Sequence, residues 1–175
     1  FMQNRAYMVT FEQIDPLFVI DVKDPKNPKV LGKLKIPGFS NYLHPYDDTT
    51  LIGLGKDTTT TSWGGVRTKG IKLSLFDVAD VSSPKEINSY IMGGSGSDSI
   101  ALQDHKAFLF SKDKNLLTIP ANIYESSIGN NLSDKFVFSG AVVFKVDKTG
   151  FKLQGKIDHS DGGKTASQDY WDGYY

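Results

Sequence analysis

Two stretches of the chain read as copies of one another: residues 16–38 are PLFVIDVKDPKNPKVLGKLKIPG, and residues 72–94 are KLSLFDVADVSSPKEINSYIMGG. Aligning Asp21 with Asp77 gives an offset of 56 residues (77 − 21) between the copies. In both, an apolar run ends in Asp-Val, a polar turn follows, and a strand-like run of polar and apolar residues comes next. Repetition at such a period indicates a protein built from several copies of one supersecondary unit.

A third, more divergent copy occupies residues 139–160, SGAVVFKVDKTGFKLQGKIDHS. Lys145 stands there where Asp77 stands in the second copy, and the proline shared by the first two copies, Pro28 and Pro84, is missing. A carboxylate at the end of a buried strand can accept hydrogen bonds from the amides of the following turn. A proline at the start of a strand costs little, because its missing donor is not needed there. We therefore predict structural roles for the paired aspartates and prolines.

Short runs of β-branched and aromatic residues follow one another along the chain, separated by turn residues, and this pattern is typical of an all-β protein. Helix signals are weak throughout. Counting a strand or hairpin before each copy, the repeat contains about four strands. The expected strands are 5–11, 17–22, 29–36, 50–56, 71–78, 85–92, 106–111, 116–123, 141–146 and 151–157.

A four-stranded unit at this spacing is typical of the blades of a β-propeller, whose sheets stack around an axis and bury each other's apolar faces. The apolar runs LFVIDV (17–22) and LSLFDV (73–78) are expected to be innermost strands, packed on both faces. A β-sandwich would need no repeat, and a parallel β-helix would show a shorter period. We predict an all-β, propeller-like arc of about three four-stranded blades. The predicted units are 5–38, 41–94 and 99–160, followed by a C-terminal tail at 161–175.

Composition narrows the possible partners. The 175 residues include 20 Lys plus Arg and 20 Asp plus Glu, and this neutral balance argues against nucleic acid or an anionic membrane as a partner. Without cysteine, the chain can have no disulfide, thiolate zinc site or Cys nucleophile. No apolar run reaches the ~20 residues needed to cross a bilayer. The chain opens in mid-pattern at Phe1, so we expect a fragment whose arc is open or completes itself by homo-oligomerisation.

Three long stretches carry a family resemblance: RAYMVTFEQIDPLFVIDVKDPKNPKVLGKLKIPGFSNYLHPY (5–46), GIKLSLFDVADVSSPKEI (70–87) and DHKAFLFSKDKNLLTIP (104–120). Nearly the whole chain resembles the secreted β-propeller domain family of archaea and bacteria. FVIDVKDPKNPKVLG (18–32) is similar to the LVIVD-type repeat of other surface propellers. The resemblance implies a propeller fold and a secreted or cell-surface location. It implies no catalytic residue and no established activity.

Among the polar residues of the sequence, the adjacent pair Asp104-His105, just before an apolar run, is the first candidate for a functional site. A carboxylate beside an imidazole can orient the ring for general-base or metal chemistry, although neighbours on a strand point to opposite faces. The alternative is a histidine that hydrogen-bonds a neighbouring blade at the strand start. His44 precedes Pro45, which favours extended geometry there.

The segment TTTTSWGGVRTKG (58–70) is expected to be a loop inserted between two strands of one blade, with Trp63 at its tip. Exposed aromatic residues on loops serve protein or carbohydrate recognition, whereas a Trp packed beneath its loop does not. Both possibilities stay open from sequence. Asn131-Leu132-Ser133 forms a glycosylation sequon.

Neither a metal nor a cofactor is predicted. The three histidines are scattered and lack the spacing of zinc ligands. Asp158, Asp161 and GSGSDS (94–99) could offer oxygen ligands to calcium, but neither segment fits an EF-hand or a glycine-rich calcium repeat. These segments are expected to be solvated loops.

The sequence favours a non-enzymatic binding or scaffolding propeller outside the cell, which contacts a protein or glycan through its loops. The candidate binding residues are Trp63, Asp104, His105 and His44. The alternative is a hydrolase- or lyase-type enzyme whose residues converge near the propeller axis, with the last three as first candidates. A purely structural spacer role is the third reading.

Overall fold

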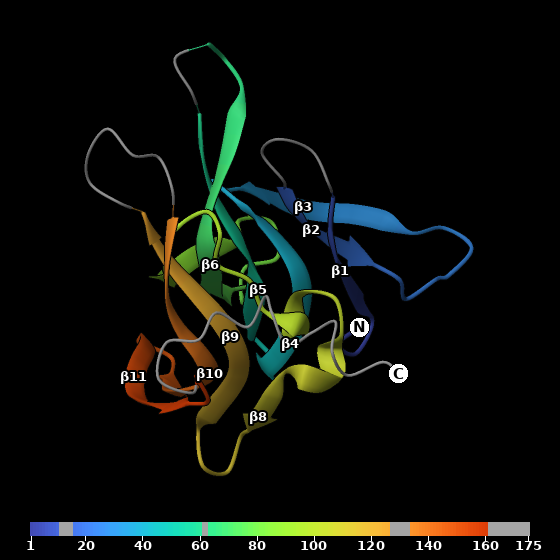
Figure 1. Cartoon of the computed structure of the whole chain (residues 1–175). Helices are drawn as coiled ribbons and strands as arrows, with labels where there is room; N and C mark the ends of the chain where they lie inside the picture. Colours follow the sequence, from blue (N-terminus) through green and yellow to red (C-terminus); the bar gives the residue numbers. More distant parts are fainter. Residues whose placement is uncertain (11–15, 61–62, 127–133, 161–175) are drawn as a thin grey trace, which may run out of the picture.

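The structure, a computed structural model, describes residues 1–10, 16–60, 63–126 and 134–160. The regular structure of these residues consists of β-strands and two short 3₁₀ turns (Figure 1). The elements are β1 (Arg5–Val9), β2 (Pro16–Asp21), β3 (Lys29–Lys35), β4 (Phe39–Asp47), β5 (Thr50–Thr60), β6 (Val66–Asp77), β7 (Lys85–Met92), η1 (Ile100–Leu102), η2 (His105–Ala107), β8 (Leu109–Ser111), β9 (Leu116–Ser126), β10 (Asp134–Asp147) and β11 (Gly150–Asp158).

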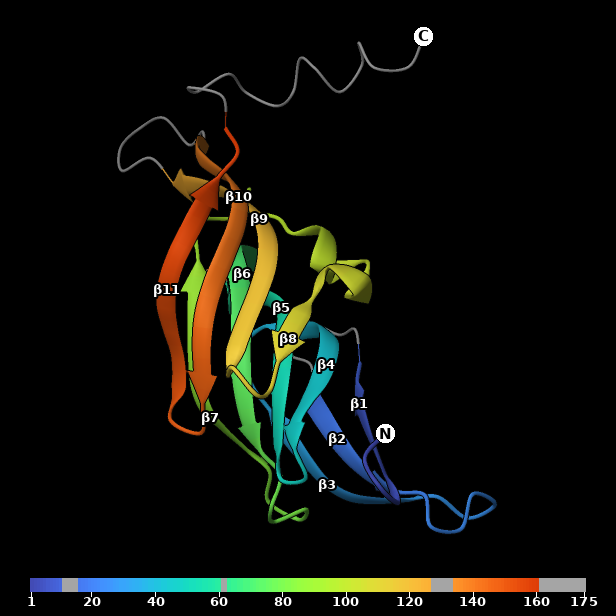
Figure 2. The ribbon, with the colours of Figure 1, turned by 90° about the horizontal axis from the view of Figure 1, so that it is seen from below.

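The strands form three antiparallel sheets in chain order: β1-β2-β3, β4-β5-β6-β7 and β8-β9-β10-β11. Figure 2 shows the second and third sheets lying face to face, with the first sheet beside the second. We call them blade 1, blade 2 and blade 3. The predicted all-β, propeller-like arc that does not close is confirmed. Blade 1 has three strands within the described part of the chain, where the repeat led us to expect four.

Two apolar cores lie between the blades, as stacked sheets require. The core between blades 1 and 2 contains Leu17 and Phe76 together with Leu51. The larger core between blades 2 and 3 joins Leu73 and other side chains of β5 and β6 to those of β9 and β10, among them Phe144. Each sheet thus covers a face that its neighbour could not bury alone.

The expectation that 17–22 and 73–78 form innermost strands is wrong. These segments form β2 and β6, and each is hydrogen-bonded to a strand on both sides. In blades 2 and 3 the innermost strands are instead the first ones, β4 and β8, which lie at the sheet edge. The continuous apolar run of β6 arises because the strand is paired on both edges and packed on both faces, so residues 70–76 are all buried.

The two aspartates that define the repeat occupy matching corners. Asp21 accepts a hydrogen bond from the amide of Lys23 at 2.8 Å, and Asp77 accepts one from the amide of Ala79 at 2.9 Å. Each turn contains a second aspartate, Asp24 or Asp80, whose carboxylate accepts a hydrogen bond of 3.0 Å from the backbone amide two residues further along. The structural role predicted for the repeat aspartates is confirmed, because each carboxylate satisfies amides of its own turn.

Each of the three blades carries a β-bulge where its outermost strand pairs with the apolar strand before it. A bulge strengthens local twist and re-aims the side chains beyond it. The register shifts occur at Val19/Ile20, Leu75/Phe76 and Val143/Phe144. The divergent third copy is therefore a structural copy too, although it has lost the repeat aspartate and proline.

Sequence reasoning misplaced three elements. It missed β4 altogether, because Pro45 and the polar residues around it hide the strand signal. Pro45 is tolerated because β4 lies at a sheet edge, where the missing N–H need not pair. The strand expected at 106–111 begins with the 3₁₀ turn η2, and the loop expected at 58–70 is largely a continuation of the β5–β6 ladder.

Blade 1 and blade 2 are in close contact at Gly32 of β3. A methyl group placed on Gly32 would overlap the carbonyl oxygen of Val81, in the turn between β6 and β7. We expect Gly32→Val to lower the free energy of unfolding by about 1–3 kcal/mol, the usual cost of overpacking. Chemical denaturation followed by tryptophan fluorescence or circular dichroism measures the change.

Gly155→Val is the matched control for this prediction. Gly155 occupies the equivalent place on β11, and a methyl group there would meet nothing within 4 Å among the described residues. Its effect on the free energy of unfolding should be within about 0.5 kcal/mol, as for most surface changes. Equal destabilisation by the two substitutions would contradict the close blade–blade contact.

Candidate functional site

An aromatic cluster lies where β4 of blade 2 meets η2 and β8 of blade 3. Its centre is the Tyr42 ring, which stacks on the His105 ring with centroids 6.0 Å apart and 24° between planes. The Tyr42 ring also meets the edge of Phe108 at 5.1 Å. His44 contacts Phe108 at 5.2 Å and Phe110 at 5.3 Å. We call these five residues the aromatic cluster.

A hydrogen bond of 3.0 Å joins the Tyr42 hydroxyl to Nδ1 of His44. Burial raises the pKa of the Tyr42 phenol and lowers the pKa of the His44 imidazole. At neutral pH the phenol is therefore protonated and the imidazole is neutral. The hydroxyl donates to Nδ1 when the imidazole carries its proton on Nε2, and Nδ1 donates to the hydroxyl oxygen in the other tautomer.

The cluster continues along β4 to Tyr46, whose ring lies 5.7 Å from that of Phe110. The Lys112 ammonium sits 3.1 Å from the centroid of the Tyr46 ring, a cation–π contact that places positive charge beside the cluster. The Tyr46 hydroxyl donates to Oδ1 of Asn115 at 3.0 Å. Both contacts hold the β8–β9 turn against the β4 edge.

A hollow of about 390 Å³ opens beside the cluster along β8. His44, Phe108 and Phe110 line it, together with the largely exposed Leu109 and the ammonium-bearing Lys114. Apolar walls with a few polar groups are typical of binding sites for small groups or side chains. The aromatic cluster and this hollow form the candidate site.

The structure brings together two of the four residues predicted from sequence. The rings of His44 and His105 each lie 6.0 Å from the Tyr42 ring, measured between centroids. Asp104 does not point its carboxylate at the His105 ring, because that carboxylate caps η2 and accepts the Lys106 amide at 2.9 Å. Trp63 is 95% exposed on the β5–β6 hairpin, which projects beyond the sheets in Figure 1.

Sequence reasoning missed the aromatic members Tyr42, Phe108 and Phe110. A signal was present for β4, since Tyr42, His44 and Tyr46 follow one another at a spacing of two and so share one face of a strand. This spacing places residues on one face only if the segment is a strand, and the sequence analysis did not predict a strand there. No local pattern indicated that this face meets η2 and β8, which lie some 60 residues further along.

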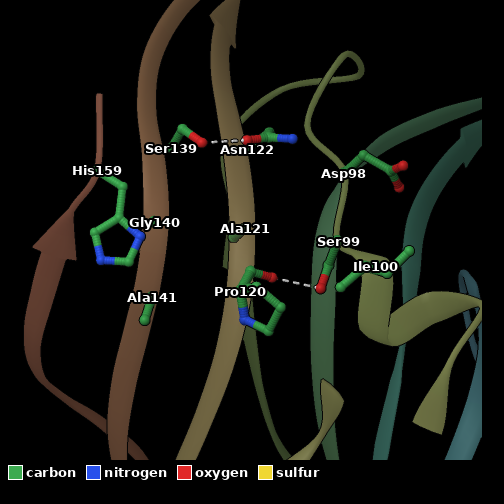
Figure 3. Close-up of a pocket in the computed structure, with 10 residues that line it drawn as sticks. All are labelled: Asp98, Ser99, Ile100, Pro120, Ala121, Asn122, Ser139, Gly140, Ala141 and His159. Carbon is green, nitrogen blue, oxygen red and sulfur yellow. Dashed lines mark hydrogen bonds between the residues drawn. The ribbon is translucent and has the colours of Figure 1, made fainter. Parts of the chain in front are cut away.

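A second hollow, of about 240 Å³, lies between η1 and strands β9 and β10 (Figure 3). Several of its polar groups already have partners within the protein. The Ser99 hydroxyl donates to the Pro120 carbonyl at 2.5 Å, and the Ser139 hydroxyl donates to Oδ1 of Asn122 at 2.7 Å. Asp98 forms an ion pair with Lys56 at 3.4 Å. The aromatic cluster, in which His105 is exposed and Tyr42, His44 and Phe110 are partly exposed, is therefore the stronger candidate for ligand contact.

The acidic and histidine residues do not converge elsewhere. In the described part of the chain no three His, Asp or Glu side chains gather where they could hold a metal ion. Asp158 accepts hydrogen bonds from the amide and hydroxyl of Ser160, which lower its pKa. Asp161 and the sequon 131–133 lie outside the described residues. Within the described ranges, no helix has the length and apolar character needed to cross a membrane.

Comparison with known proteins places these features in context. A family model described as "Beta propeller domain" matches residues 1–175. The chain is 37% identical over 159 residues to an uncharacterized protein of Methanocaldococcus jannaschii, covering 91% of this chain and 21% of that protein. It is 44% identical over 116 residues to an uncharacterized protein of Archaeoglobus fulgidus, covering 66% of this chain and 17% of that protein. The chain spans about a fifth of the length of these relatives.

Proposed function

The chain belongs to the β-propeller domain family, and from this premise we propose that it is a non-enzymatic binding or scaffolding module acting outside the cell. Its partner would be a protein or a glycan. The observation that supports this proposal best is the aromatic cluster, whose partly exposed rings come from two blades and border a hollow. The extracellular location rests on the resemblance to secreted propellers.

Ring faces suit a binding role because they offer large contact areas at little cost in side-chain entropy. Tyr is enriched among the residues that dominate binding energy in protein interfaces. Tyr42 is held by its hydrogen bond to His44 and by the ring of Phe108, so little freedom remains to be lost when a partner binds. A protein partner could insert an apolar side chain beside the exposed Leu109.

The alternative function is a hydrolase or lyase with its site near the propeller axis. One observation favours it: the His44 imidazole is hydrogen-bonded to the Tyr42 hydroxyl and burial lowers its pKa, so that it is neutral and a possible general base. Asp104 offers this pair no second carboxylate, because it is used to cap η2. We therefore place the enzyme reading second.

We expect His105→Ala to weaken partner binding at least tenfold, because the substitution removes an exposed ring that stacks on Tyr42 in the proposed contact surface. A residue at the centre of an interface commonly contributes about 2 kcal/mol or more. Affinity would be measured by titration of the strongest hit from a glycan array and from a peptide display library.

The control is Trp63→Ala, which removes a larger and more exposed ring from a different place. It should leave affinity unchanged, and both variants should melt at the wild-type temperature. Loss of binding with Trp63→Ala alone would move the site to the β5–β6 hairpin. Turnover of a carbohydrate polymer that disappears with His44→Ala would support the enzyme reading instead.

A further inference from the structure

One end of β6 has a neighbouring strand on only one side. The last residue of β7, Met92, pairs with Ile71, whereas β5 continues beside β6 until Thr60 pairs with Val66 (Figure 1). Within the described part of the chain, residues 66–69 therefore have a neighbouring strand only in β5. Their other side presents backbone N–H and C=O groups to which a further strand can bind. We call residues 66–69 on this side the β6 edge.

Two glycines explain why β7 does not follow β6 to its end. Gly93 has a φ of +65°, a left-handed conformation that turns the chain directly after Met92. At Gly70 the two segments lie so close that a methyl group would overlap the carbonyl oxygens of Met92 and Gly93. The chain therefore leaves β6 at Gly70, and β7 does not occupy the place beside the β6 edge.

A hollow of about 500 Å³ lies along the β6 edge. Arg67, Thr68 and Lys69 line it on one side, and all three are exposed. The exposed Ile91 of β7 and the turn at residues 93–95 line it on the other side. The hollow thus lies between β6 and the departing chain, where a strand added to the β6 edge would run.

The side chains beside the β6 edge carry an excess of positive charge. Arg67 pairs with Thr59, and Asp57 precedes Thr59 by two residues, so these three side chains share one face of the ribbon. The Lys69 ammonium reaches the same face, because it forms an ion pair of 3.7 Å with the buried Asp57. Arg67 forms no ion pair with any described residue. Its guanidinium can therefore bind an added carboxylate through two parallel hydrogen bonds.

The turn on the far side of the hollow already binds a carboxylate of the chain itself. Oδ2 of Asp134 accepts hydrogen bonds of 2.7 Å from the Ser95 hydroxyl and from the Gly96 amide. Cations on an edge strand also have a protective function, because they prevent edge-to-edge aggregation. Protection needs no space beside the strand, however, whereas the β6 edge borders a hollow large enough for a short peptide segment.

We propose that the β6 edge binds an extended, acidic segment of a partner protein, which adds to the sheet as a strand and places a carboxylate on Arg67. Addition of a strand to an exposed sheet edge is a common mode of peptide recognition. Main-chain hydrogen bonds provide the affinity in that mode, and alternate side chains provide the specificity. This inference goes beyond the proposed function and uses no residue of the aromatic cluster.

The geometry of a strand determines which partner sequence fits. Successive side chains of the added strand point to opposite faces, so acidic residues at every second position share the face of Arg67 and Lys69. Opposite charges on neighbouring strands stabilise their pairing, and like charges destabilise it. β-branched residues between the acidic ones favour the extended conformation that the edge requires. The expected ligand is therefore a segment in which acidic and β-branched residues alternate.

Fluorescence anisotropy with a labelled peptide of alternating glutamate and valine tests the proposal. The peptide should bind saturably, and added salt should weaken the binding because the charges lie near the surface. Arg67→Glu should weaken binding at least about fivefold, since it places like charges on neighbouring strands. Lys33→Glu is the matched control, because it reverses an exposed cation on another edge strand, β3, and it should leave the affinity unchanged. Both variants should keep the wild-type circular dichroism spectrum.

A peptide of the same sequence with a methylated backbone separates strand addition from simple charge attraction. It keeps every carboxylate but loses main-chain donors, so it should bind at least about tenfold more weakly. Equal affinity of the two peptides, equal effects of Arg67→Glu and Lys33→Glu, or no binding at millimolar peptide would overturn the proposal. Binding of a glucuronate oligosaccharide that depends on Arg67, without binding of the peptide, would overturn it too and assign the hollow to an acidic glycan.

Discussion

Phe76→Ala is expected to lower the free energy of unfolding by about 3–5 kcal/mol, the usual cost of removing a fully buried phenylalanine ring. The ring has no exposed surface, and it packs with Leu17 of blade 1 and Leu51 of its own blade. It also lies so close to Gly53 that a methyl group there would meet the ring at 2.8 Å. Alanine would leave a cavity at the contact between blades 1 and 2.

Urea denaturation followed by circular dichroism measures this loss. Phe1→Ala is the matched control, because the same atoms are removed from a residue that is 92% exposed. The control should change the free energy of unfolding by no more than about 0.5 kcal/mol. A loss below about 1 kcal/mol for Phe76→Ala would contradict the close packing of blade 1 on blade 2.

Glu86→Leu is expected to lower the free energy of unfolding by about 3 kcal/mol, because it leaves the buried Lys72 ammonium without its negatively charged partner. The Lys72 ammonium lies 2.9 Å from Oε1 of Glu86, and their side chains are 7% and 18% exposed. Lys72 also donates to the Pro37 carbonyl at 3.0 Å, which ties blade 2 to the segment that leaves blade 1. Without the Glu86 carboxylate, the neutral Pro37 carbonyl would be left to stabilise the Lys72 ammonium.

The double variant Lys72→Met with Glu86→Leu separates the charge effect from the packing effect. Replacing both members of a buried pair with apolar residues is often close to neutral, so the double variant should regain most of the stability lost in Glu86→Leu. Glu125→Leu, at an exposed glutamate of β9, is the control for adding an apolar side chain to a strand. If the double variant lost as much free energy of unfolding as the two single variants together, the Lys72–Glu86 pair would have no coupling energy.

The fold was predictable to the extent that it repeats. Asp21 and Asp77 share a local chemistry, a carboxylate that accepts amides of its own turn, and this chemistry is visible as a pattern in the chain. The edge strand β4 was not predictable in the same way. It contains Pro45, and its place depends on pairing with β5 and on contact with blade 3.

The candidate site was predictable only in part, for a related reason. His44 and His105 were singled out as reactive residue types, but their common neighbour Tyr42 was not. Asp104 was considered as a partner for the His105 ring, yet a cap within its own turn uses its carboxylate.

The sequence by itself determined the repeat, the all-β class and the turn chemistry of each copy, because these depend on residues close together in the chain. Only the tertiary structure decided which strands lie at the inner edge and which rings from different blades meet. Such contacts join residues far apart in sequence, and they arise when each sheet hides its apolar face against whichever sheet the chain brings beside it.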